Sequence, residues 1–235
     1  MKTIFRITVM LLVAAFYSCQ KNEITIGNSS ITSDGVLSGT IVNDSNRIDS
    51  IKVYGENLLG NGTVSAYGKF STILTTPVLR KIGSAPSGVV ISDTTAMVFS
   101  VDQFKVFKGI MYQGNIYKSN YNVDDSINAG ESTSEFTYSN RLFTIKGQQV
   151  QTYTYNGLTY NLKANYNVTF KKGWNEVVLK IDFYSKTTTT TTLVETLSNF
   201  ITSDLQWRYY PHNASYVRAK TQGVQDVVRQ GFLFR

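Results

Sequence analysis

The chain of 235 residues has few of the side chains on which most enzyme and metal chemistry depends. It contains one cysteine, one histidine and three prolines, and only 17% of its residues are charged. A single cysteine excludes an intramolecular disulfide and a zinc site built from cysteines. The single histidine, His212, follows Pro211 in a predicted turn, and no Gly-x-Ser-x-Gly elbow occurs. We therefore expect a protein that is not an enzyme.

Aromatic and uncharged polar residues take the place of the missing charges. Aromatic residues make up 13% of the chain, with 15 tyrosines and 13 phenylalanines, and there are 17 glycines. Tyrosine, phenylalanine and threonine favour strands, whereas asparagine and glycine favour turns. The composition predicts an all-β protein and argues against both a helix bundle and a disordered chain.

The first 18 residues have the pattern of an export signal. Lys2 and Arg6 supply positive charge, and an apolar run of ten residues follows from Ile7 to Phe16. A membrane-spanning helix needs roughly 20 apolar residues, so this run has the length of a signal peptide instead. Tyr17 and the small residue Ser18 follow the run, and the only cysteine, Cys19, comes directly after them. This placement predicts a signal peptide over 1–18.

The sequence Phe16-Tyr17-Ser18-Cys19 resembles the lipobox of bacterial lipoproteins. In that family the signal is cut before the cysteine, which then carries acyl chains such as palmitate. The resemblance implies that Cys19 is the lipid attachment residue and that Gln20 directs the protein to the outer membrane, facing either the periplasm or the cell surface. The alternative is an ordinary signal peptide with an accidental cysteine. Removal of Lys2 and Arg6 would lower the net charge from +7 to +5.

Composition along the chain predicts a tether and two β regions. Residues 19–35 read as the lipidated cysteine and a flexible tether, 36–90 as an N-terminal β subdomain, and 91–235 as a C-terminal β-sandwich. The early strand Gly39-Thr40-Ile41-Val42 and the later Gly68-Lys69-Phe70 resemble those of small transthyretin-like sandwiches. We expect an antiparallel β-sandwich, built either as one unit or as two packed β subdomains.

The strongest local pattern is a β-hairpin. Asn156-Gly157 is typical of a two-residue hairpin turn, because both positions favour positive φ. The register then places Tyr155 opposite Leu158 and Tyr153 opposite Tyr160. Apolar and polar residues alternate without error over 158–171. Val177, Leu179, Ile181 and Phe183 then alternate with Glu176, Val178, Lys180 and Asp182, so we predict a three-stranded meander with one core face. The run of six threonines over 187–192 predicts either an edge strand or a loop.

The order of these features is similar to that of a group of uncharacterised Bacteroidetes lipoproteins. The matching residues are Ser18–Lys21, Ser50–Val53, Gly68–Ser71 with Pro77, Val90–Asp93 and Lys172–Asn175. The resemblance implies the compartment and the fold, and it implies no activity.

Aromatic residues are the first candidates for a binding site. Rings present a flat apolar face with a polar edge, which suits stacking against sugars. The residues that we would test are Trp207, Tyr209, Tyr210 and Trp174. The alternative is that these rings pack in the core or at the end of a sandwich.

A loop rich in oxygen ligands is a second candidate. Asp124, Ser126, Asn128 and Glu135 occupy the first, third, fifth and twelfth positions of a Ca²⁺-binding loop. Ala129 stands at the sixth position, where that loop needs glycine. Clustered acids are more often a solvated loop, so the expectation is either no cofactor or a calcium ion.

Two functions from different classes remain open. The first is a lipid-anchored cell-envelope binding module for a glycan or an envelope protein. The second is a structural or assembly lipoprotein that docks on a membrane partner and binds no small ligand. The basic residues are scattered, with no run of five, so we expect no nucleic-acid partner.

Overall fold

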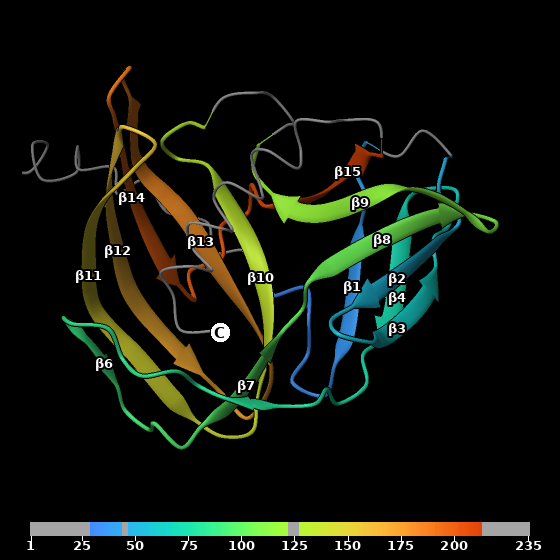
Figure 1. Ribbon diagram of the computed structural model, residues 1–235. Helices are drawn as coiled ribbons and strands as arrows, with labels where there is room; N and C mark the ends of the chain where they lie inside the picture. The colour runs from blue at the N-terminus through green and yellow to red at the C-terminus, as the bar shows by residue number, and fades with distance from the viewer. Residues whose placement is uncertain (1–28, 44–46, 122–126, 213–235) are drawn as a thin grey trace, which may run out of the picture.

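The fold is all-β, with mostly antiparallel strands in open sheets (Figure 1). The computed structural model describes residues 29–43, 47–121 and 127–212. The predicted signal peptide and Cys19 lie outside these residues. Within the same ranges, no helix combines the length and the apolar composition that crossing a membrane requires.

Fifteen strands are formed in the described part of the chain. They are β1 (Val36–Thr40), β2 (Ser50–Tyr54), β3 (Leu58–Thr63), β4 (Lys69–Ile73), β5 (Arg80–Lys81), β6 (Val89–Ile91), β7 (Met97–Ser100), β8 (Gln103–Lys108), β9 (Met111–Ser119), β10 (Ser132–Ser139), β11 (Phe143–Tyr155), β12 (Leu158–Phe170), β13 (Gly173–Lys186), β14 (Thr190–Ser198) and β15 (Gln206–Pro211).

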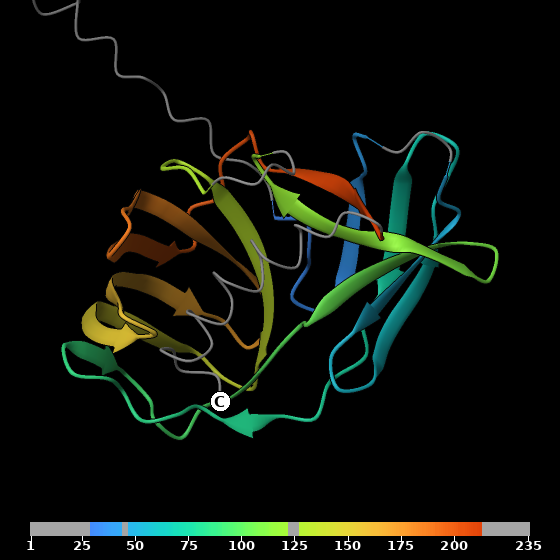
Figure 2. The same cartoon turned by 45° about the horizontal axis from the view of Figure 1, so that its top comes forward.

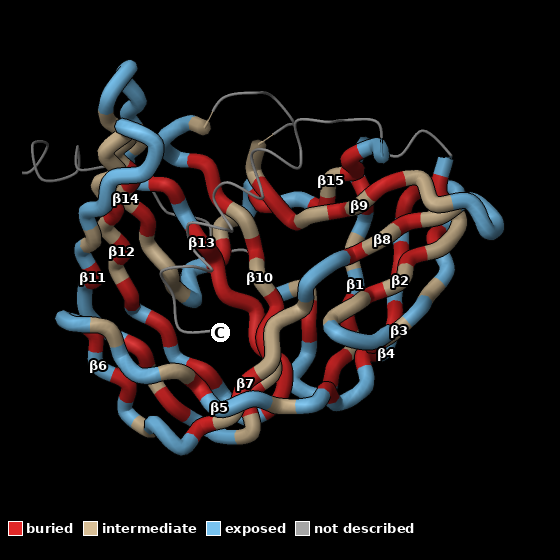
Figure 3. The backbone as a smooth tube through the Cα atoms, viewed as in Figure 1, coloured by how far each residue is buried: buried red, intermediate tan, exposed pale blue. Residues whose placement is uncertain are grey.

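A hydrophobic core lies between a two-stranded sheet and part of the large sheet. β1 pairs with β4, and β2, β3, β8, β9 and β15 form one end of the 13-stranded sheet. Ile51 and Val53 of β2 and Val106 of β8 are fully buried there, while Lys52 and Lys105 between them point outward. Figure 3 shows this alternation of buried and less buried residues along the strands. It follows from the two-residue period of side chains on a strand.

β10 joins the two ends of the large sheet. One of its edges pairs with β13 over its whole length. Its other edge pairs with β9 at Thr133 and with β7 over Thr137–Ser139. Seen from the second direction, the two groups of strands lie on either side of it (Figure 2). Because β8 pairs with β2, the predicted division at residue 90 does not coincide with a boundary between sheets.

The predicted hairpin is confirmed residue by residue. Tyr155 pairs with Leu158 and Tyr153 with Tyr160 across the turn between β11 and β12. Asn156 and Gly157 have φ values of 50° and 76°, which the two-residue turn requires. From residue 162 to residue 170, every second side chain of β12 is buried in the core.

The predicted three-stranded meander is wrong, because β12 and β13 are not neighbours. β14 lies between them, parallel to β12 and antiparallel to β13. Residues 190–192 of the threonine run therefore lie in a central strand, not at an edge. Thr187 accepts hydrogen bonds from the backbone N–H groups of Thr189 and Thr190 and turns the chain before that strand. The hairpin rule describes sequential neighbours only, whereas β14 enters the sheet through a non-local parallel pairing.

Candidate functional site

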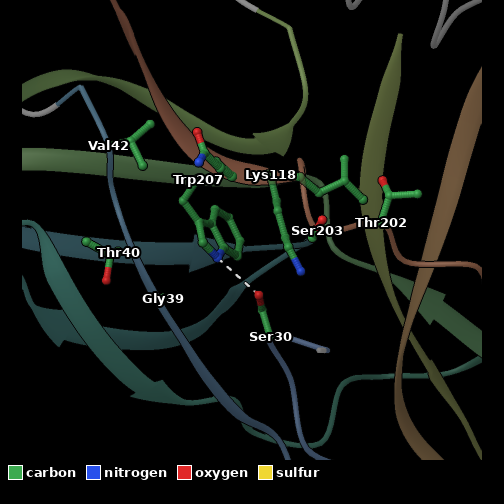
Figure 4. A pocket seen from close by; sticks show the side chains of 10 residues that line it. Ser30, Gly39, Thr40, Val42, Lys118, Thr202, Ser203 and Trp207 are labelled. Atoms are coloured by element: carbon green, nitrogen blue, oxygen red, sulfur yellow. Dashed lines mark hydrogen bonds between the residues drawn. The ribbon is translucent and has the colours of Figure 1, made fainter. Parts of the chain in front are cut away.

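A cleft lies where the N-terminal segment meets the start of β15. Its volume is about 510 Å³, within the range of small-molecule sites. Segment 30–42, Lys118 of β9 and segment 202–207 contribute its lining side chains. In Figure 4, Lys118 and Trp207 extend toward Ser30 from the strands that carry them. Three parts of the chain that are far apart in sequence thus meet at one place.

Hydrogen bonds fix the N-terminal segment against β15. Val42 N donates to Trp207 O over 2.9 Å, and Ile41 forms a parallel bridge with Trp207. Further along the segment, Ser30 N donates to Glu176 Oε2 over 2.6 Å, and Ser29 Oγ donates to the same oxygen over 3.2 Å. The wall of the cleft is therefore held at both ends.

A buried ion pair lies beneath the cleft. Lys118 Nζ donates to Glu176 Oε1 over 2.6 Å, and Ser134 Oγ donates to the same oxygen over 2.6 Å. The side chains of Lys118 and Glu176 are 5% and 0% exposed. Ser29 and Ser30 bond the other oxygen, so each carboxylate oxygen of Glu176 accepts two hydrogen bonds. A buried charge is tolerated only when it is paired and hydrogen-bonded in this way. The ammonium of Lys118 is thereby positioned at the cleft.

Trp207 links the cleft to the core. Its ring stacks on Phe136 at 5.4 Å and meets Phe70 and Phe104 edge-on, each at 5.2 Å. Its Nε1 donates to Ser30 Oγ over 3.3 Å. A Cβ atom at Gly39 would lie 2.3 Å from the indole, so glycine is required for this close approach. Trp207 is 2% exposed and shows the cleft only part of its ring.

The other three candidate aromatics are core residues. Trp174 packs edge-on against Tyr138 at 5.5 Å. The Tyr209 hydroxyl donates to Gln113 O over 3.0 Å, and the Tyr210 hydroxyl bonds Ser119 Oγ over 2.9 Å. All three are buried, and none of them lines the cleft. The structure thus favours the core alternative, because the polar tips of the tyrosines are satisfied inside the protein and no ring face is left for an exposed stacking platform.

The calcium-loop prediction falls partly outside the described residues, since Asp124 and Ser126 lie there. Asn128 Nδ2 donates to Glu131 Oε1 over 3.0 Å, and Glu135 lies on β10 opposite Val177. In the ranges that the structure describes, no three acidic, histidine or cysteine side chains are grouped to hold a metal ion. The calcium loop stays a prediction.

Glu195, in the middle of β14, is a buried acid that the sequence reading missed. It is 2% exposed, and within the described structure its Oε1 has no hydrogen-bond partner. Burial raises its pKa to about 8, and the negative charges of Glu135 and Asp182 add to the effect. The sequence could have indicated this burial. Side chains alternate along a strand, so residue 195 lies on the same face as the inward-facing Leu193 and Leu197.

Comparisons of the chain with protein-family models, with curated proteins and with solved structures find no match. What the findings establish is an all-β protein. The resemblance to Bacteroidetes lipoproteins remains a prediction, and the cleft is the feature of the described structure that points to a function.

Proposed function

We propose that this protein is a lipid-anchored β-sandwich module of the bacterial cell envelope that binds a glycan in the cleft beside Trp207. The composition of the cleft carries the proposal. Most of the side chains that line it are polar. Four carry a hydroxyl group, one an amide, one an ammonium and one an indole: Ser30, Thr40, Thr202, Ser203, Gln206, Lys118 and Trp207. No carboxylate is among the described residues that line it.

These groups suit a ligand rich in hydroxyl groups. Hydroxyl and amide side chains both donate and accept, so they can exchange hydrogen bonds with a sugar in several orientations. The apolar edge of Trp207 and the side chains of Val42 and Leu205 can pack against the carbon face of a sugar ring. Glu176 compensates the charge of Lys118, because its Oε1 lies 2.6 Å from the Lys118 Nζ, so the cleft suits neutral sugars.

The cleft is also close in sequence to the proposed anchor. Ser30 lines it, and only the segment 20–28 separates Cys19 from the first described residue, Ser29. Ten residue steps of extended chain span at most about 36 Å. A protein anchored through Cys19 would therefore hold its cleft near the membrane, where envelope glycans are abundant.

The proposal can be tested on an array of bacterial-envelope glycans. The probe is the mature chain from residue 19 with Cys19→Ser, which lacks the lipid. The double variant Ser203→Ala and Gln206→Ala removes two polar groups of the cleft, and we expect it to bind about tenfold or more weakly. Trp207→Ala is unsuitable, because emptying the core there costs about 3–5 kcal/mol of stability.

A matched control keeps the test specific. Gln148→Ala with Ser185→Ala removes the same two side-chain types from exposed positions on β11 and β13. This control is expected to bind as wild type. Two results together would contradict glycan binding and favour the structural or assembly role. The wild-type protein would bind no glycan on the array, and cross-linking would join it to a defined envelope protein.

A further inference from the structure

The outward face of β2, β8 and β9 concentrates lysines and aromatic rings. Lys52 of β2 lies directly opposite Lys105 of β8 in the register. Lys52 Nζ lies 4.6 Å from the centre of the Phe107 ring, and Lys105 Nζ lies 5.0 Å from that of Tyr54. Lys105 Nζ also lies 5.9 Å from the centre of the Tyr112 ring. Each lysine thus crosses to a ring on a neighbouring strand.

Within the described ranges of the chain, this arrangement brings two positive charges together and neither forms an ion pair with an acidic residue. The ion pairs of the described residues involve Arg80, Lys118, Arg141 and Lys180, and none of them involves Lys52 or Lys105. Like charges directly opposite each other on adjacent strands destabilise a sheet. The ring contacts offset part of this repulsion. The face is therefore complementary to a surface that carries negative charge.

The turn between β8 and β9 adds a second, independent feature. Ile110 is 93% exposed and Met111 is 65% exposed. Among the described residues, they are the only two large apolar residues adjacent in sequence that are both this exposed. In both views the turn projects beyond the neighbouring strands (Figures 1 and 2). Exposed apolar residues scattered singly are ordinary, but an adjacent pair on a projecting turn needs an explanation.

The turn is held in a defined shape. Gly109 has a φ of 56°, and its N–H donates to Asp49 Oδ2 over 2.7 Å. Ser50 Oγ donates to the other oxygen of Asp49 over 3.0 Å. Asp49, the carboxylate bound to the turn, is thus engaged in shaping it. Lys108 interacts with Asp49, whereas Lys52 and Lys105 lie on the outward face of the same two strands.

We propose that this hairpin and the adjoining face form a contact surface for an anionic lipid bilayer. Ile110 and Met111 enter the boundary between headgroups and acyl chains, and Lys52 and Lys105 face the lipid phosphates. Amphipathic rings beside the lysines suit the same interface. A soluble acidic polymer would match the lysines but would make no use of the apolar turn, so the two features together favour a membrane. The surface is separate from the glycan cleft and does not depend on lipidation of Cys19.

Co-sedimentation with vesicles tests this surface. The protein is the mature chain with Cys19→Ser, and the vesicles are either pure phosphatidylcholine or an equimolar mixture of phosphatidylcholine and phosphatidylglycerol. We expect binding to the mixed vesicles only. Lys52→Gln with Lys105→Gln should weaken it about twenty-five-fold, since each lysine near an anionic surface contributes about fivefold. Ile110→Ser with Met111→Ser should weaken it about tenfold or more.

Lys146→Gln with Lys163→Gln is the matched control, because it removes the same charge from outward positions on β11 and β12. Thermal melting checks that all variants are folded. The proposal is overturned if the wild type ignores the mixed vesicles, or if the control weakens binding as much as the lysine variant. It is also overturned if the change at Ile110 and Met111 has no effect while heparin competes for Lys52 and Lys105, because the partner is then a soluble polyanion.

Discussion

Lys118 Nζ lies 2.6 Å from Glu176 Oε1 in the protein interior, where Ser134 of β10 bonds the same oxygen. Lys118 belongs to β9 and Glu176 to β13, and β10 lies between these strands in the sheet. The pair therefore connects the two ends of the sheet as well as supporting the cleft. It also receives the N-terminal segment through Ser29 and Ser30.

Glu176→Gln should be strongly destabilising. The substitution leaves the buried Lys118 ammonium without its counter-charge, and breaking such a pair costs about 3–5 kcal/mol in the free energy of unfolding. Urea denaturation measures the change. Lys180→Gln is the comparison, because Lys180 and Asp182 form an exposed pair at 3.4 Å, which is worth at most about 1 kcal/mol. Equal losses in the two variants would show that the buried pair has no special role.

Glu195 should make the protein less stable in alkali. Its pKa is raised from its ordinary value of 4.5 to about 8, so folding favours the neutral acid. The resulting stability is complete below about pH 4.5 and is lost as the pH rises through about 8. Glu195→Gln keeps the shape without the titration, and its stability should depend less on pH over this window. We expect the variant to be the more stable protein at about pH 9.

Thermal melting between about pH 5 and pH 9 checks this. Glu135→Gln is an intermediate case that should reduce the pH dependence only in part, because Glu195 remains buried. Glu135 adds only part of the negative charge around Glu195. If Glu195→Gln follows the wild-type pH dependence without change, the buried acid is not its source.

Substitutions at two glycines distinguish the cost of a left-handed backbone from the cost of a steric clash. Gly157 has a φ of 76° with no neighbour within 4 Å of an added Cβ, so Gly157→Ala should cost only the left-handed conformation, about 1–2 kcal/mol. Gly173 has a φ of 97°, and an added Cβ would lie 2.2 Å from Ser33 O. Gly173→Ala should therefore cost clearly more. Chemical denaturation of both variants decides, and an equal cost would mean that Ser33 moves away freely.

The hairpin at Asn156-Gly157 could be predicted because its register depends on residues next to each other in the sequence. The insertion of β14 between β12 and β13 could not. β14 pairs with β13 as its neighbour in sequence, but its parallel pairing with β12, for example Leu193 with Leu162, joins residues that are distant along the chain. Alternation marks which face a residue occupies, and it marks Glu195 as inward without showing how a charge is accommodated there.

The candidate site was predicted only in part. The sequence offered four aromatic candidates, Trp207, Tyr209, Tyr210 and Trp174, and of these Trp207 lines the cleft. Its burial by Phe70, Phe104 and Phe136 and the role of Lys118 depend on strands that meet only in the folded sheet. Neither composition nor motif spacing contains that information.

The most direct test of the central claim uses Trp207 itself as the reporter. The chain has two tryptophans, so Trp174→Phe leaves the cleft tryptophan as the only one. This variant is titrated with lipid-free polysaccharide from outer-membrane lipopolysaccharide and with soluble peptidoglycan fragments. Glycan binding in the cleft predicts a saturable change in Trp207 emission that Ser203→Ala with Gln206→Ala weakens. Emission that stays constant at saturating amounts of every glycan that the protein binds would contradict it.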